Sequence, residues 1–275
     1  MASGNSSSLW YVYGVVPANF SAGSAPHGLD DTAVSIERAE HGDIAALVSR
    51  LEHPDYEPAT LEERSGDVEW LSPRATAHDR VLTWASDRGA VVPLPMFSLF
   101  SGQPAVQTML RDRERQLGAA LEHIGTAREY ALRAYRVDAE LLVAIPSLSP
   151  RLQELSSNAA NASPGQRYLL ERKLENEKKA EMRTVTQGVV DEIVDSLRPR
   201  ARSVVRSPIP RVSDAEAARG TMVLNAAFLV DPASLTDFQK TLTDLVVERG
   251  AQGFRFDFTG PWPPYHFVNE ATDGA

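Results

Sequence analysis

The sequence predicts an α+β protein of two domains. The chain has 275 residues, and at about 150 residues per domain this length favours two domains, with one large α/β core as the alternative. Apolar residues make up 43% and charged residues 24% of the chain, which is typical of a globular protein and excludes a disordered or fibrous one. Segments with the periodicity of strands and of helices are mixed along both halves.

The first half is predicted to contain four strands and two helices. Residues 9–16 are rich in aromatic and β-branched types and stop at Pro17, as a strand does. Apolar runs on both sides of Gly42 predict a β-hairpin. Ser72 suits an N-cap and Pro73 a first helical position, so a helix is expected there. The expected strands are 9–16, 33–37, 44–49 and 90–94, and the expected helices are 73–88 and 104–128. The expected loops are 20–32 and 51–69, the second with a helical turn.

The second half has the predicted order β-α-β-β-α-β. This order is typical of the ferredoxin-like split βαβ arrangement, an antiparallel sheet with helices on one face. We expect residues 9–132 to form the first domain and residues 133–270 the second. The expected strands are 133–145, 203–209, 221–230 and 254–259, and the expected helices 146–157, 166–197 and 233–250.

Composition excludes several classes of function and partner. The absence of cysteine excludes disulfides, thiolate metal sites and cysteine nucleophiles. The 28 basic and 37 acidic residues give a net charge of −9, which opposes binding to nucleic acid. No apolar run approaches the 20 or so residues that a membrane span needs, so no membrane partner is expected. The first residues lack the basic and apolar regions of a signal peptide, so we expect a cytoplasmic protein.

No motif for catalysis, a cofactor or a metal ion is found. The sequence contains neither a phosphate-binding glycine loop nor a nucleophile elbow. Its histidines do not form the paired spacing of a zinc site. His78 and Asp79 are an adjacent histidine–carboxylate pair on a predicted helix, but neighbouring helical residues point about 100° apart and would not share a site. We therefore expect a protein that is not an enzyme, with no catalytic residues, no cofactor and no metal.

The long helix expected at 166–197 is the first candidate for partner binding. At about 1.5 Å per residue it is longer than a small sheet, so part of it would overhang. Its apolar stripe is interrupted for two turns between Leu174 and Met182, where most residues are charged. The overhang is either a solvated helix end or a docking arm. Its candidate contact residues are Arg172, Lys173, Glu177 and Lys178.

The last candidate is residues 260–268, Gly-Pro-Trp-Pro-Pro-Tyr-His-Phe-Val, which we call the C-terminal ribbon. Its prolines hold the chain extended. Trp262, Tyr265 and Phe267 carry too much apolar area to remain in water. The ribbon either packs across its own domain or presents aromatic side chains to a partner, and Trp262 and Tyr265 are the candidate contacts.

The C-terminal ribbon resembles the G-P-W-P-P-Y-x-F signature that ends the GvpF/GvpL family of gas vesicle proteins. Five other segments are similar to family motifs in the same order, so the resemblance covers nearly the whole chain. They are Tyr11–Val16 with the opening strand, Gly42–Ser49 with the hairpin, His78–Leu82 with H-E-x-V-L, Pro164–Leu170 with G-x-x-Y-L, and Met222–Val230 with L-N-A-A-Y-L-V.

One segment departs from the family pattern. Where the family reads V-L-P-L-R-F-G-T-V-F, this chain has Pro95 in the arginine position and Phe97 in the glycine position. Any role of that arginine, in an ion pair or in partner binding, is lost here. A divergent paralogue with a narrower or different partner is therefore one interpretation.

The resemblance implies a ferredoxin-like N-terminal domain and an α+β C-terminal domain with projecting helices. It also implies a non-enzymatic accessory protein of gas vesicle assembly. Such a protein would bind the small hydrophobic shell protein and other vesicle proteins, keep them soluble like a chaperone, and help to nucleate the vesicle. The alternative is a minor structural component that remains in the vesicle wall.

Overall fold

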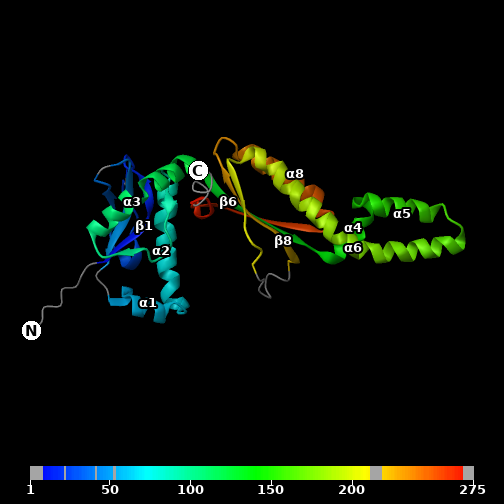
Figure 1. The fold of residues 1–275 in the computed structure, drawn as a ribbon, viewed down its shortest axis with the longest axis horizontal. Coiled ribbons are helices and arrows are strands. Elements are labelled where there is room, and N and C mark those ends of the chain that lie inside the picture. The colour runs from blue at the N-terminus through cyan, green and yellow to red at the C-terminus, as the bar shows by residue number, and fades with distance from the viewer. Residues whose placement is uncertain (1–8, 22, 41, 52–53, 211–218, 269–275) are drawn as a thin grey trace, which may run out of the picture. The chain divides into compact units, whose positions relative to one another are not determined.

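The computed structural model describes residues 9–21, 23–40, 42–51, 54–210 and 219–268 (Figure 1). Our expectations for the first eight residues and for the last two of the predicted second domain lie outside this range. The chain divides into two compact units, one of residues 1–129 with 261–275 and one of residues 130–260. The described part of the C-terminal ribbon from Pro261 onward thus belongs to the first unit, not to the predicted domain 133–270.

The first unit is a sheet between two helices. Its strand order is β2-β3-β1-β4, and β5 also pairs with β1. Strand β1 lies between β3 and β4 in this sheet. Alternate side chains of a strand point to opposite faces of the sheet, so β1 contributes to the packing on both faces. Val12 packs with helix α3 on one face, and Tyr11 packs with helix α2 on the other. The elements are β1 Leu9–Pro17, η1 Leu29–Asp31, β2 Ser35–Arg38, β3 Ile44–Leu51, η2 Pro54–Tyr56, α1 Pro58–Arg64, α2 Val68–Ser86, β4 Val92–Pro93, β5 Leu99–Phe100, α3 Gln103–Ile124 and η4 Tyr265–Phe267.

The second unit has a four-stranded sheet in the order β7-β8-β6-β9. Its first strand in the chain lies between the third and the fourth, as the split βαβ arrangement requires. One core contains Leu132 and Phe228 of the sheet, Ile193 of helix α6 and Phe238 of helix α8. The elements are β6 Arg128–Arg136, α4 Asp138–Leu148, α5 Pro150–Ala160, α6 Pro164–Leu197, η3 Arg198–Arg200, β7 Ser203–Arg206, β8 Thr221–Val230, α8 Leu235–Gly250 and β9 Phe254–Trp262.

The predicted α+β class is confirmed, with two antiparallel sheets and helices packed on them. The order β-α-β-β-α-β describes the second unit once the consecutive helices α4, α5 and α6 are taken as one crossover. The first unit, which the family resemblance implied to be ferredoxin-like, has the order β-β-β-α-α-β-β-α.

The prediction of a strand at 133–145 is wrong after Arg136. Helix α4 begins at Asp138, and its acidic first turn suits the positive end of a helix. The continuous apolar run at residues 141–145 is compatible with a strand or with a helix, so periodicity alone does not distinguish the two. Packing decides it: Leu141 and Ile145, four residues apart, are both fully buried. The helix predicted at 146–157 is instead α5, where the Ser149 hydroxyl accepts a hydrogen bond from the Leu152 N–H.

Several other boundaries also move. The segment 51–69, predicted as a loop with a helical turn, contains the seven-residue helix α1 and the start of α2. Helix α2 begins four residues before Ser72, because the Asp67 carboxylate accepts a hydrogen bond from the Trp70 N–H and caps the helix there. Pro73 therefore lies inside the helix. The strand expected at 203–209 ends at Arg206, and the strand expected at 90–94 is reduced to β4.

Helix α6 has 34 residues, and only its C-terminal half lies in the core. Val189, Ile193 and Leu197 are buried there. The N-terminal half runs beside α5, and the two helices form a hairpin that extends beyond the sheet of the second unit (Figure 1). We call residues 150–183 of this hairpin the arm. The predicted overhang is thus present, and α5 packs along it.

The orientation of α4 predicts unequal effects of two neighbouring substitutions. Leu141 is 0% exposed and Val143 is 82% exposed, whereas residues two apart would share a face in a strand. We expect Leu141→Ala to lower the free energy of unfolding by about 2–5 kcal/mol through the cavity that it leaves. We expect the matched control Val143→Ala to lower it by less than about 0.5 kcal/mol. Urea denaturation of the full chain measures both, and equal losses would contradict the helix.

Candidate interaction surfaces

The two helices of the arm are joined by a narrow apolar seam and by ion pairs at its side. Leu152 of α5 is buried, and Leu174 of α6 packs at the edge of the same core. The Arg151 guanidinium lies 2.9 Å from the Glu177 carboxylate. The Ser149 hydroxyl donates a 3.0 Å hydrogen bond to Glu181. These contacts occupy one side of α6 and leave its opposite side without a partner in the described chain.

The structure separates the four charged residues predicted on this helix. Arg172 and Lys173 are exposed on the arm, as a docking surface requires. Glu177 is turned towards α5 and bound by Arg151. The Lys178 ammonium is bonded to the Glu175 carboxylate of its own helix. Lys173 lies 3.8 Å from the Glu177 carboxylate one turn further along, so among the four residues only Arg172 forms no ion pair within the described part of the chain.

Two exposed apolar residues on the arm were not among the predicted contacts. Tyr168 is 63% and Leu169 is 66% exposed, near the start of α6. Arg172 follows Tyr168 by four residues, so the two side chains are neighbours on the helix surface. Aromatic and arginine side chains are the types enriched among residues that dominate binding energy. The sequence could have indicated that Tyr168 and Leu169 are exposed, because both residues lie off the apolar stripe of α6.

The C-terminal ribbon packs on the first unit. Tyr265 is hydrogen-bonded to the Asp79 carboxylate of α2, and burial raises the pKa of the Tyr265 phenol above its usual value. The His266 N–H donates to Glu129 at 3.0 Å, and His266 Nδ1 lies 2.7 Å from the same carboxylate. Phe267 is fully buried. Asp79, which stands in the glutamate position of the family motif, thus helps to hold the ribbon.

The two predicted contact residues of the ribbon remain partly accessible. Trp262 is 42% exposed and Tyr265 is 41% exposed. They lie in the first unit, whereas Arg172 and Lys173 lie in the second. The six predicted residues therefore form two separate candidate surfaces. The ribbon therefore packs on its own unit through Phe267 and at the same time exposes part of the Trp262 and Tyr265 rings.

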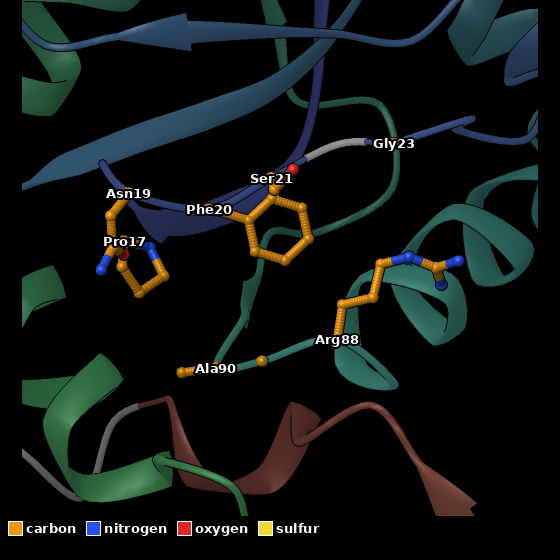
Figure 2. A pocket seen from close by; sticks show the side chains of 8 residues that line it. Pro17, Asn19, Phe20, Ser21, Gly23, Arg88 and Ala90 are labelled. Carbon is orange, nitrogen blue, oxygen red and sulfur yellow. The ribbon is translucent and has the colours of Figure 1, made fainter.

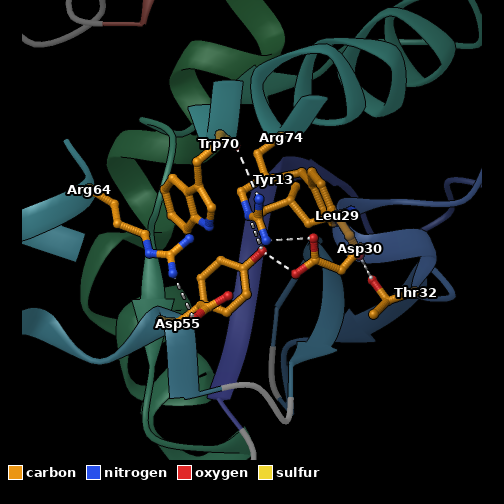
Figure 3. Close-up of polar contacts among 9 residues, drawn as sticks. Tyr13, Leu29, Asp30, Thr32, Asp55, Arg64, Trp70 and Arg74 are labelled. Carbon is orange, nitrogen blue, oxygen red and sulfur yellow. Dashed lines mark hydrogen bonds and ion pairs between the residues drawn. The ribbon is translucent and has the colours of Figure 1, made fainter. Parts of the chain in front are cut away.

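A polar cluster in the first unit is occupied by its own members (Figure 3). The Tyr56 hydroxyl donates to Asp30 at 2.6 Å, and Arg74 Nε donates to the same hydroxyl at 2.9 Å. Arg74 also forms an ion pair with Asp30 at 2.9 Å, and its guanidinium lies 4.1 Å from the ring centre of Trp70. Since the charges are paired inside the cluster, its role is to join the segment around Tyr56 to α2.

The family departure at Phe97 has a structural consequence in the same region. Phe97 has φ +63°, in the left-handed region that glycine adopts without strain. Its ring stacks on Trp70 with centroids 5.5 Å apart. Its N–H donates to the Tyr11 hydroxyl at 3.3 Å. The aromatic contacts thus accompany a backbone conformation that a phenylalanine adopts only at a cost.

His78 is buried with an aromatic neighbour and does not pair with Asp79. Its Nδ1 lies 2.7 Å from the Tyr11 hydroxyl, and its ring stacks on Tyr13. Burial lowers the pKa of His78 to about 4, so the ring is neutral at pH 7. As the sequence predicted, the two side chains do not form one site: His78 points into the core, and Asp79 binds the ribbon.

Two cavities in the described part of the chain are lined by charged side chains that already have a hydrogen-bond or ion-pair partner. One of about 510 Å³ is lined by Arg88–Ala90 and by five residues that precede β2, namely Pro17, Asn19, Phe20, Ser21 and Gly23 (Figure 2). Arg88 there donates to the Trp84 carbonyl and lies over its ring. The other, of about 620 Å³, contains the ion pair Arg255–Glu140. Across the described ranges, no three histidine or carboxylate side chains gather as metal ligands, and no helix there could cross a membrane.

The ribbon contact predicts a pH dependence of stability. Hydrogen bonding to Glu129 raises the pKa of His266 above its usual value. A raised pKa in the folded state adds stability below the unfolded pKa of about 6.5, and this stability is lost as the pH rises through the folded value. Near pH 6 we expect the free energy of unfolding of the unmodified protein to be higher than that of the His266→Gln variant. The difference should be about 1 kcal/mol or less, because the His266 ring is half-exposed. Thermal unfolding should show this margin shrinking near pH 9, and a growing margin would contradict the ion pair.

Solved structures share the fold. The crystal structure of the gas vesicle protein GvpF from Anabaena sp. PCC7120 superposes with a TM-score of 0.67 over 95% of this chain and 96% of that one, at 17% sequence identity. The GvpF structure from Microcystis aeruginosa gives a TM-score of 0.64 at 19% identity, over 95% and 99% of the two chains. At such identities the likeness concerns the fold alone.

Sequence comparison places the chain in a family. It is 28% identical over 269 residues to gas vesicle protein L of Streptomyces sp. strain CB03234, covering 96% of this chain and 94% of that protein. Residues 9–269 match the family described as gas vesicle synthesis protein GvpL/GvpF. The ribbon and the long-helix motif quoted above lie within that range. This chain therefore belongs to the GvpL/GvpF family of gas vesicle synthesis proteins.

Proposed function

We propose that this protein is a non-enzymatic accessory factor of gas vesicle assembly. It acts in the cytoplasm, binds the small hydrophobic shell protein and other vesicle proteins, and keeps the shell protein soluble until the vesicle nucleates. Membership of the GvpL/GvpF family supports a role with gas vesicle components. A shell protein with apolar faces aggregates when those faces are unpaired, so a binder that covers them promotes ordered assembly.

The observation that carries the proposal is the exposed pair Tyr168 and Leu169 on the arm. An apolar partner gains most from an aromatic anchor that is fixed on a helix, since little side-chain freedom is then lost on binding. Arg172 and Lys173, one turn further along, supply a polar rim. Trp262 and Tyr265 of the ribbon are the second proposed contact, for the shell protein or another vesicle protein.

The arm contact is tested by the double variant Tyr168→Ser/Leu169→Ser. We expect the shell protein that co-purifies with the tagged chain to fall at least tenfold, because both anchors are removed. The matched control is Val247→Ser, which changes a residue 72% exposed on helix α8. Co-expression followed by quantitative mass spectrometry measures the effect. Unchanged recovery of the shell protein by the double variant would remove the arm from the proposal.

The ribbon contact is tested by Trp262→Ala. Since this side chain is 42% exposed, we expect the fold to survive and the recovery of one vesicle protein to fall. Circular dichroism and thermal unfolding report the fold, and co-purification reports the partner. Phe267→Ala is the comparison, because Phe267 is fully buried and its loss should destabilise the first unit by about 3–5 kcal/mol. If Trp262→Ala unfolds the protein as well, the ribbon is structural only.

A further inference from the structure

The unpartnered side of the arm has a line of free cations. Arg172, Lys179 and Arg183 follow one another at steps of seven and four residues, so they lie on one side of α6. All three are exposed, and none forms an ion pair within the described residues. Glu175 flanks this line and is bonded to Lys178. We call Arg172, Lys179 and Arg183 the basic ridge.

The arm is opposite in charge to the rest of the chain. Residues 150–183 contain seven lysine or arginine residues and five glutamates, so 7 − 5 gives +2. The whole chain is at −9, which leaves −9 − 2, or −11, for the remainder. Opposite charges on two surfaces of one protein favour contact between copies, with an attraction that salt weakens.

The strongest concentration of negative charge is residues 55–69, which we call the acidic segment. It contains six carboxylates and one arginine, so 6 − 1 gives a net charge of −5. Glu62, Glu63 and Glu69 are exposed and form no ion pair within the described residues. Val68, beside them, is 74% exposed. The segment therefore offers free carboxylates around an apolar side chain.

Arg64 and Tyr56 attach the acidic segment to neighbouring side chains, while α1 itself buries no residue. Arg64 lies over the Trp70 ring at 5.8 Å from its centre and 3.9 Å from the Asp55 carboxylate (Figure 3). Tyr56 is fixed by Asp30 and Arg74. A surface that is already ordered loses little freedom on binding. The basic ridge spans about 16 Å at 1.5 Å per residue, comparable with α1 and the first turn of α2 together.

We infer that the basic ridge binds the acidic segment of a second copy of this chain. The contact joins unlike surfaces, so it forms either reciprocal pairs or longer assemblies. It pairs the free cations of one copy with the free carboxylates of the other, and it places Val68 against the helix surface around Asn176 and Ala180. This self-association goes beyond the proposed function and leaves Tyr168 and Leu169 for the shell protein.

Charge exchange between two variants tests this inference. The first variant carries Arg172→Glu, Lys179→Glu and Arg183→Glu, and the second carries Glu62→Lys, Glu63→Lys and Glu69→Lys. We expect the unmodified protein to self-associate at about 0.05 M salt and to dissociate at about 0.5 M, where the screening length is short. Each variant alone should associate at least tenfold more weakly. Their equimolar mixture should recover association, because the reversed ridge then meets the reversed segment. Light scattering after size-exclusion chromatography measures every sample.

A matched control separates this contact from general charge effects. Arg80→Glu, Arg115→Glu and Lys240→Glu change the net charge as much as the ridge variant does, at exposed positions elsewhere. We expect this control to associate like the unmodified protein. A monomeric protein at low salt, or a mixture that fails to recover, overturns the inference. The double variant Lys179→Glu/Arg183→Glu keeps Arg172, which belongs to the proposed shell contact, and separates the two proposals. Weaker self-association with full recovery of the shell protein supports the inference, and loss of the shell protein by this double variant would assign the ridge to that partner instead.

Discussion

A helix that is longer than the sheet beneath it determines the form of the second unit. At 1.5 Å per residue the 34 residues of α6 extend about 51 Å, whereas the ten residues of β8 extend about 33 Å. The sheet is therefore too short to cover the whole helix, and the residues of α6 that are buried lie in its C-terminal half, where Val189, Ile193 and Leu197 meet the core. The other half has α5 as companion and keeps one side open to solvent. Both surfaces that we assign to the arm exist because of this difference in length.

The C-terminal ribbon shows how a local motif contributes to a distant part of the chain. Prolines make the segment stiff, so a few side chains are enough to place it. Asp79 and Glu129 receive Tyr265 and His266, and Phe267 is buried. Residues 261–268 thereby complete the first unit rather than the one that precedes them in sequence. The family signature therefore has a structural meaning here, besides any contact that Trp262 makes with a partner.

The polar groups of the first unit are used to stabilise the fold. Asp30, Tyr56 and Arg74 satisfy one another, and His78 remains neutral beside Tyr11 because burial disfavours its charged form. Phe97 accepts a left-handed backbone conformation and contributes a ring to the same aromatic group. Free charges lie on the arm of the second unit and, within the first unit, at the exposed positions Glu62, Glu63 and Glu69 of the acidic segment, where they are able to meet another protein.

The sequence by itself determined the α+β class, the β-α-β-β-α-β order of the second half, the long helix and the family, because these follow from local periodicity, helix caps and an unusual proline–aromatic motif. It did not distinguish strand from helix at Leu141–Ile145, where an unbroken apolar run fits both, and only packing against α5 and α6 decided. It also did not reveal that Glu177 faces α5 while Arg172 is free, or that the ribbon joins the first unit. Such facts depend on which residues meet across long separations in the chain, and that information arises only when the whole structure is packed.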